Sequence, residues 1–336
     1  MSILSTTSTS DAACVSSSMS KEEWSTTVDS DIICGVVRDL IRRLQWDPLP
    51  DEVDERLEAA ILDTVSSWDL SDQIRRSLLG AVPVAVYMSS MSYAQDFDFE
   101  RKLLIALLDL CLIHVDNATH AMFDACEAFV PRLLARQPQL DPVLEHLAAL
   151  LPRLSEFYHP FVTSAMSTSA LHYVSACCIE DRASEVPVSA SSVAWPWDFR
   201  KMTGIAPLFG HAIFPLATFP DVTAYLQAMP DIEYFINMLN DVLSFYKEEM
   251  AHETANYIRA DSLARGLTPT QALVQCAEDT INEHDRAVKI LSEAHTGAAD
   301  LVAAWKAFVR GYIGFHVHSK RYLLAPLLHA GADAQD

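Results

Sequence analysis

Asn240, Ser244 and Glu248 follow one another at intervals of four residues inside a long helical pattern. This spacing places the three side chains in one row along a helix face. The two outer side chains are long enough to lean towards the short Ser244, so an amide oxygen, a hydroxyl and a carboxylate can converge on one point. These are hard oxygen ligands, which Mg²⁺ accepts when it also keeps waters and phosphate oxygens. Lys247 can place a positive charge beside the same point.

An ordinary solvated helix face is the alternative interpretation, because three polar residues at this spacing are common. The apolar residues of the same segment favour a site, since they form a broad stripe and the triplet lies at its edge. Polar oxygens that border a core face need partners, and a metal ion can supply them. The stripe consists of Ile232, Phe235, Ile236, Leu239, Leu243, Tyr246 and Met250.

The row Asn240-x-x-x-Ser244-x-x-x-Glu248 resembles the second metal-binding motif of class I terpene cyclases. The longer run NDVLSFYKE is similar to the version found in the trichodiene synthase family of fungal sesquiterpene cyclases. Three further short motifs extend the resemblance, in the family's order and at similar spacings. The resemblance implies that Asn240, Ser244 and Glu248 bind metal.

Asp116 ends a very apolar segment, 97–116, and stands where the family has its aspartate-rich first motif. The resemblance implies that Asp116 also binds metal. The run DNATH has one carboxylate where the family usually has two or more, and an Asp that caps a helix break is the alternative interpretation. Asn117 and His120 stay open as metal contacts, and Asp109, on the same helix face, is a weaker candidate.

Arg200, Thr203 and Gly204 match the family's order of diphosphate sensor, linker and effector. The planar fork of an arginine grips phosphate oxygens at two points. A glycine at this place can unwind the helix and expose a carbonyl dipole. Taken alone, Arg200-Lys201 would more often be a pair of surface cations.

Arg321 and Tyr322 resemble the family's closing Arg-Tyr pair. The resemblance implies that Arg321 holds the diphosphate and that Tyr322 donates a further hydrogen bond. Their place on the last long helix, well after Asn240, supports the match. His318 stands where the family often has an acidic residue.

The elements that must position these residues are helical. Half of the 336 residues are apolar and only nine are Gly, which favours helix over loop or strand. The pattern predicts a single all-α domain, and the resemblance implies an α-helical bundle of the class I terpenoid synthase type with a central apolar cavity. We expect a flexible tail at 1–30, the cyclase domain at 31–328 and a C-terminal tail at 329–336. The expected helical segments are 32–44, 53–65, 73–91, 97–116, 121–136, 140–153, 155–178, 197–209, 221–229, 231–259, 268–295 and 300–327.

Composition excludes several classes of function. The formal net charge of −21 argues against nucleic acid as a partner. An acidic protein that binds a polyanion must gather its few cations at the site or use metal ions. The seven Cys show no zinc-binding spacing and fit buried reduced thiols. We expect no apolar run long enough for a membrane span, and no signal-peptide pattern occurs at the start, so a cytoplasmic location is expected.

The implied function is that of a sesquiterpene synthase. Its substrate would be farnesyl diphosphate, ionised with three Mg²⁺ ions and cyclised to a hydrocarbon or an alcohol. Arg200, Lys247, Arg321 and Tyr322 would bind the diphosphate. Aromatic faces can stabilise the cation through their quadrupole, although core packing is the plain interpretation for most of them. The candidates are Trp305, Phe308, Tyr312, Phe315, Tyr87 and Phe123.

Two alternatives stay open. A chain-elongating prenyl transferase would share the bundle, but it would be expected to show two aspartate-rich motifs instead of the Asn/Ser/Glu row. A helical interaction protein without activity is kept open by the sparse Asp116 motif. A homodimer is also left open, and the motifs do not encode which product is made.

Overall fold

The computed structural model describes residues 27–93, 98–182 and 188–325, and these contain helices and no β-strand. The expected all-α architecture is therefore confirmed for this part of the chain. The α-helices are α2 Ser30–Arg43, α3 Glu55–Ser67, α4 Asp72–Ser92, α5 Phe99–Ala118, α6 Phe123–Leu134, α7 Pro142–Leu150, α8 Pro160–Asp181, α9 Trp195–Thr203, α10 Ala206–Ala212, α11 Met229–Ala251, α12 Tyr257–Arg265, α13 Pro269–Ser292 and α14 Ala298–His318. Short 3₁₀ turns connect several of them.

The helices begin where side chains can satisfy the free N–H groups of the first turn. Asp98 caps α5 by accepting from the N–H groups of Glu100 and Arg101. Thr268 and Gln271 form the expected capping box at the start of α13, with Pro269 at the first helical position. Gly297 was expected to end that helix, but α13 ends at Ser292 and Gly297 begins α14 in a left-handed conformation with a φ of 63°.

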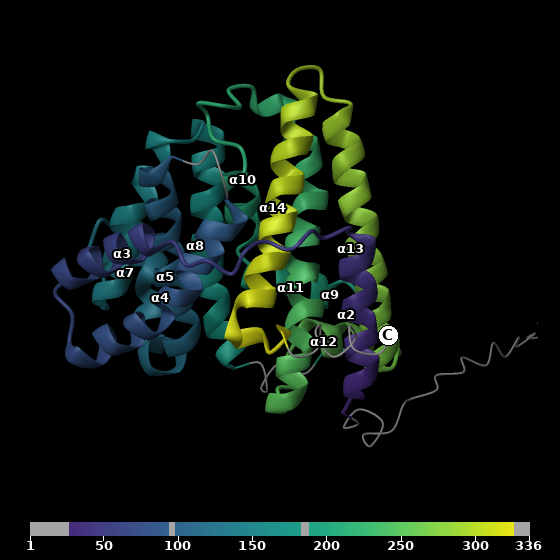
Figure 1. The fold of residues 1–336 in the computed structure, drawn as a ribbon. Coiled ribbons are helices and arrows are strands. Elements are labelled where there is room, and N and C mark those ends of the chain that lie inside the picture. The colour runs from purple at the N-terminus through teal and green to yellow at the C-terminus, as the bar shows by residue number, and fades with distance from the viewer. Residues whose placement is uncertain (1–26, 94–97, 183–187, 326–336) are drawn as a thin grey trace, which may run out of the picture.

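Figure 1 shows α11 and α14 side by side in the middle of the bundle, with α2 and α13 on one side and α3, α4, α5, α7 and α8 on the other. Most residues of α5 are buried, and the helix packs against α4, α7 and α8. An apolar helix surrounded in this way is expected at the centre of a bundle. The packing against α4, α7 and α8 therefore fixes the position of α5 in the core.

The stretch Phe99–Leu134 is long and apolar enough to cross a membrane by length and composition, and 67% of its most apolar window is buried inside the bundle. No such stretch was expected from the sequence. A core helix that is apolar on every side meets the same criteria as a membrane span, and α5 occupies such a core position.

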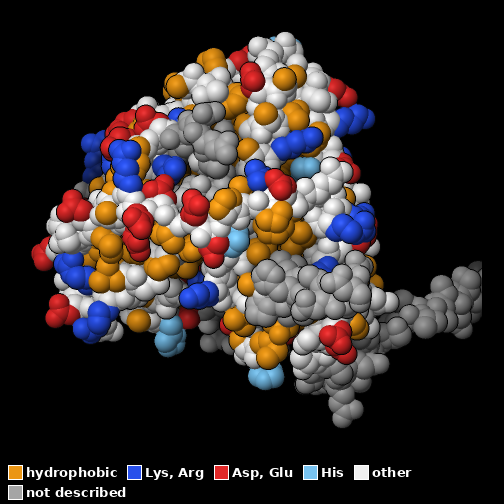
Figure 2. Space-filling view, in the orientation of Figure 1, with side chains coloured by type: hydrophobic (Ala, Val, Ile, Leu, Met, Phe, Trp, Pro, Cys, Tyr) orange, Lys and Arg blue, Asp and Glu red, His pale blue; other side chains and the backbone are white. Residues whose placement is uncertain are grey.

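Acidic and basic side chains alternate over the molecular face in Figure 2, and its described residues form no continuous basic patch. This distribution agrees with the strongly negative net charge.

The expected helix 231–259 is wrong in one respect, because α11 ends at Ala251 and a separate helix, α12, follows. His252 adopts a left-handed conformation with a φ of 57° and closes the end of α11. The chain reversal lets Arg259 of α12 pair with the buried carboxylate of Glu249 at 2.9 Å. The same carboxylate accepts a hydrogen bond from the backbone N–H of Val28 at 2.9 Å.

Three other expected segments also differ. The segment 197–209 divides at Gly204 into α9 and α10, and 221–229 consists of two 3₁₀ turns before α11 begins. The last helix ends at His318 rather than near 327. Of the two expected tails, 1–26 and 329–336 lie outside the described residues, while Val28 is already buried in the fold.

Candidate active site

A cavity of about 830 Å³ lies between α4, α5, α8, α9, α11, α12 and α14. Its size falls in the range of small-molecule sites. Every site residue expected from the sequence lines this cavity except Ser244, which is buried and hydrogen-bonded to Glu248. Those lining it are Asp116, Arg200, Thr203, Gly204, Asn240, Lys247, Glu248, Arg321 and Tyr322. Apolar side chains that also line it include Val84, Met88, Leu112, Ile113, Phe209 and Ile236.

The expected row on α11 is held together by its own hydrogen bond. The hydroxyl of Ser244 donates to Oε1 of Glu248 at 2.6 Å, and Nζ of Lys247 lies 3.7 Å from the same oxygen. Burial raises the pKa of Glu248 above its ordinary value, although Ser244 and Lys247 both lower it. A further cation near Glu248 would favour its charged form.

Arg200 connects α9 to the start of this row. Its Nε lies 2.9 and 2.8 Å from the two carboxylate oxygens of Asp241, and its Nη2 donates to Oδ1 of Asn240 at 3.1 Å. Burial alone lowers the pKa of Arg200, but the charge and hydrogen bonds of Asp241 outweigh it and raise the pKa. Asp241 was not expected as a site residue, but it is buried on α11, and a buried carboxylate needs a partner.

His316 of α14 fixes the orientation of the Asn240 amide. Nδ1 of His316 lies 2.7 Å from the carbonyl oxygen of Tyr312, which can only accept, so Nδ1 carries the proton. Nε2 therefore accepts from Nδ2 of Asn240 at 3.0 Å, which leaves Oδ1 of Asn240 on the Arg200 side. Burial lowers the pKa of His316 to about 3, so the ring is neutral. The sequence signal that could have identified His316 is a polar residue within the aromatic pattern of α14.

Arg321 and Tyr322 were expected on the last long helix, but they lie on the 3₁₀ turn Lys320–Tyr322 that follows α14. Ser319 is extended there, and the turn brings the ring of Tyr322 to 4.4 Å from that of His316 and 5.5 Å from that of Phe315. This packing outweighs the local helical preference. It also brings Nη2 of Arg321 to 3.4 Å from Oδ2 of Asp116 on α5.

Of the candidate residues near Asp116 in the sequence, one lines the cavity and two do not. Asp109 lines the cavity and is buried, and its Oδ2 has no hydrogen-bond partner among the described residues. Burial raises its pKa to about 7. Asn117 and His120 do not line the cavity, and Nδ1 of His120 lies 3.2 Å from Asp181.

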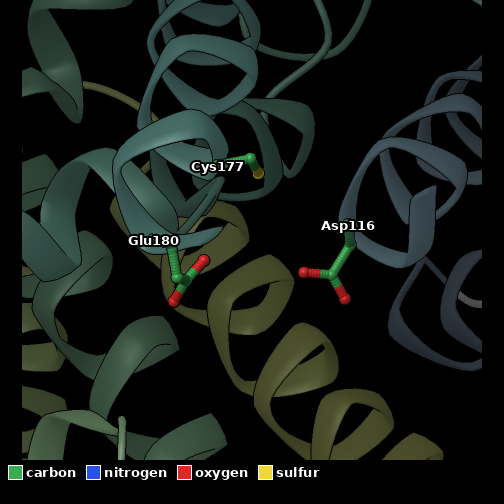
Figure 3. Close-up of side chains that lie close together, drawn as sticks. All are labelled: Asp116, Cys177 and Glu180. Atoms are coloured by element: carbon green, nitrogen blue, oxygen red, sulfur yellow. The ribbon is translucent and has the colours of Figure 1, made fainter. Parts of the chain in front are cut away.

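Glu180, near the end of α8, lines the same cavity and was not expected from the sequence. Asp116, Cys177 and Glu180 each offer a ligand atom within 4.8 Å of the others. Figure 3 shows the carboxylates of Asp116 and Glu180 facing each other from α5 and α8, with Cys177 above the gap between them. The sequence signal is the same one that identified Asp116, because no Asp, Glu, Lys or Arg occurs from 157 to 179 before Glu180.

Two of the six aromatic candidates line the cavity, namely Tyr312 and Phe315. Trp305 and Phe308 are buried in the core instead. The Tyr87 hydroxyl donates to Asp51, and the Phe123 ring lies under the guanidinium of Arg182. Aromatic residues from other helices, which were not expected, line the cavity in addition: Tyr173, Trp195, Phe199, Phe209 and Tyr257.

Gly204 ends α9 in an extended conformation, and the space around its Cα is filled. A Cβ at this position would collide with Oδ1 of Asn237 and lie 2.8 Å from Nη1 of Arg200. We therefore expect Gly204→Ala to displace Arg200 and to lower turnover about 10²-fold, because small misplacements of a catalytic group have effects of this size. The measurement is steady-state turnover of the purified variant.

Gly80→Ala is the matched control. A Cβ on Gly80, within α4, meets nothing within 4 Å, so this change should leave turnover unaltered and stabilise the helix by about 0.5–1 kcal/mol. Full turnover in Gly204→Ala would show that the close contact with Arg200 does not matter.

The bundle has the fold of class I terpene synthases, as its likeness to solved structures of such enzymes shows. The linalool/nerolidol synthase of Streptomyces clavuligerus, crystallised with 2-fluorogeranyl diphosphate, superposes with a TM-score of 0.58. The two chains are 18% identical, and the match covers 79% of this chain and all of that one.

The particular family follows from the sequence comparisons. The family model Trichodiene synthase (TRI5) matches residues 77–336, so the chain belongs to this family, as its motifs predicted. It is 30% identical to α-cuprenene synthase COP6 of Coprinopsis cinerea over 75% of this chain and 76% of the relative. It is 32% identical to terpene synthase BipA of Cochliobolus sativus over 69% and 71% of the two chains. The protein is therefore a terpene synthase, which acts on a small-molecule diphosphate.

Proposed function

We propose that the enzyme ionises farnesyl diphosphate and cyclises the allylic cation to a sesquiterpene hydrocarbon or alcohol. The observation that carries this proposal is that Asp116 of α5 and Glu248 of α11 line one cavity whose remaining walls are largely apolar and aromatic. A diphosphate can bind to the polar groups while the isoprenoid chain lies against the apolar ones.

Enzymes of this family generally use divalent metal ions, and the donor set here fits them. Asp116, Asn240, Ser244 and Glu248 offer carboxylate, amide and hydroxyl oxygens, which are ligands that Mg²⁺ prefers. We propose that these residues hold three Mg²⁺ ions together with the diphosphate. When bound, the ions would neutralise the charge of the leaving group.

The cations of the site bind the diphosphate in this proposal. Arg200 and Arg321 can each present two N–H groups to phosphate oxygens, and Lys247 adds a point charge. Thr203 and Gly204 keep Arg200 at the end of α9, and the Tyr322 hydroxyl donates a further hydrogen bond. Arg321 pairs with Asp116 at 3.4 Å in this structure, so binding exchanges that contact for the substrate.

The rings of Tyr312 and Phe315 would stabilise the cation once the diphosphate has left. The apolar walls would exclude water, which otherwise quenches the cation. We also propose that the enzyme is cytoplasmic, and both a monomer and a homodimer are compatible with the proposed function.

The test is incubation of the purified protein with Mg²⁺ and geranyl, farnesyl or geranylgeranyl diphosphate, followed by gas chromatography and mass spectrometry. A cyclic C15 product formed fastest from farnesyl diphosphate supports the proposal. A longer prenyl diphosphate would instead indicate the chain-elongating transferase, and no product from any of the three substrates would indicate a protein without activity. Preferred turnover of geranyl or geranylgeranyl diphosphate would overturn the substrate assignment alone.

A further inference from the structure

The sequence motif at Asp116 contains one carboxylate where the family usually has two or more. The structure places a second carboxylate opposite it, on a different helix: Glu180 of α8 faces Asp116 of α5 across the cavity, with ligand atoms within 4.8 Å (Figure 3). We propose that Glu180 is a metal-binding residue that supplies this second carboxylate. The inference rests on the proposed function, since it concerns the same cation site.

The first argument is electrostatic. Among the described residues, no Lys, Arg or His nitrogen lies within ion-pair distance of Glu180, whereas Asp116 pairs with Arg321 and Asp241 pairs with Arg200. Two facing carboxylates repel each other and would also repel a diphosphate. A divalent cation between them removes both penalties.

The surroundings of Glu180 support this argument. The pKa of Glu180 is raised to about 7, first because the surrounding protein desolvates its carboxylate and next because Asp116 carries a like charge. The side chain is nevertheless open to the cavity. The charges that act on it also include Arg200, Asp241 and Glu248. Charged residues of α5, α9 and α11 therefore all act on the carboxylate of Glu180.

A second, independent observation is Asp109. It is 5% exposed, lines the same cavity, and has an oxygen without a hydrogen-bond partner among the described residues. A buried carboxylate without a partner is costly, and a cation in the cavity would reduce that cost. The burial of Asp109 and its unpaired oxygen together indicate that this wall of the cavity favours a bound cation.

Cys177 is close to the two carboxylates but is not part of the proposed ligand set. The residue is 3% exposed, and burial raises the pKa of its thiol well above the ordinary value. Mg²⁺ prefers oxygen to sulfur ligands. The cation would therefore be held by Asp116 and Glu180.

The experiment measures metal binding directly, without turnover. The full chain is titrated with Mn²⁺ in the presence of inorganic pyrophosphate, and free Mn²⁺ is quantified by electron paramagnetic resonance. We expect Glu180→Gln to weaken the tightest Mn²⁺ binding at least about tenfold, or to remove one bound ion, and Glu180→Asp to recover part of the loss.

Asp181→Asn is the matched control, because Asp181 is the next residue on α8, pairs with His120 and does not line the cavity. Asp181→Asn and Cys177→Ser should both bind Mn²⁺ as the unaltered protein does. Thermal unfolding of each variant checks that the bundle is intact. Unchanged Mn²⁺ number and affinity in Glu180→Gln would overturn the inference.

The two proposals fail separately. If the unaltered protein makes a sesquiterpene while Glu180→Gln binds Mn²⁺ normally, the role of Glu180 is wrong and the proposed function stands. If Mn²⁺ binding depends on Glu180 but no terpene forms from any prenyl diphosphate, the role of Glu180 stands and the proposed function is wrong.

Discussion

Glu248→Gln should lower sesquiterpene formation from farnesyl diphosphate by at least about 10²-fold. The substitution keeps the shape of the side chain and an oxygen that can accept from the Ser244 hydroxyl. It removes the negative charge, so the α11 row loses its only carboxylate ligand. The loss should appear mainly in kcat, because charge stabilisation at the leaving group acts on the ionisation step.

The control for this prediction is Glu233→Gln. Glu233 lies on the same helix but does not line the cavity, so the substitution should leave turnover within a small factor of the original. Circular dichroism and thermal unfolding should show an intact bundle for both variants. Equal turnover in the two variants would remove Glu248 from the mechanism.

Arg200→Met should damage both stability and activity. It leaves the carboxylate of Asp241 buried without its cation, and breaking a buried ion pair from one side costs about 3–5 kcal/mol. The Asp241 and Arg200 side chains are 11% and 16% exposed, so solvent does little to replace the contact. Turnover should fall by at least about 10²-fold, because Asn240 also loses the donor that faces its Oδ1.

The double variant Arg200→Met with Asp241→Asn separates these two effects. Removing both charges should restore most of the free energy of unfolding, measured by urea denaturation, since no unpaired charge remains. It should not restore turnover, because the guanidinium of Arg200 that binds the diphosphate is still missing. Recovered turnover in the double variant would show that Arg200 serves only to neutralise Asp241.

A surface ion pair supplies the comparison for stability. Nε of Arg153 lies 3.4 Å from Glu156, and the two side chains are 39% and 50% exposed. Arg153→Met should therefore change the free energy of unfolding by less than about 1 kcal/mol and leave turnover unaltered. A loss as large as that of Arg200→Met would mean that burial does not explain the difference.

The row on α11 could be predicted from the sequence because all its members belong to one helix. Asn240, Ser244 and Glu248 lie on one face of the helix wherever the helix is placed in the fold. Their spacing alone brings the Ser244 hydroxyl to the Glu248 carboxylate. The capping box at Thr268 is local in the same way. The apolar pattern of α5 predicted its central position, since a helix that is apolar on every side has to be buried.

Two of the wrongly expected helical segments lie where the chain reverses direction. Arg321 and Tyr322 were expected to continue a helix, and His252 was expected inside one. In both regions local preference permits helix, and contacts with distant residues decide otherwise. Tyr322 packs against His316 and Phe315, and Arg259 reaches Glu249 only because the chain turns between α11 and α12.

The sequence by itself determined the family, the helical character and the residues that one helix can align, because these follow from short-range periodicity and motifs. Only the tertiary structure placed Glu180 opposite Asp116, paired Arg200 with Asp241 and set His316 against Asn240. Each of these contacts joins helices whose spacing and orientation depend on packing throughout the core. The residues beside a charged side chain in the sequence do not indicate which charged side chain of another helix will face it after packing.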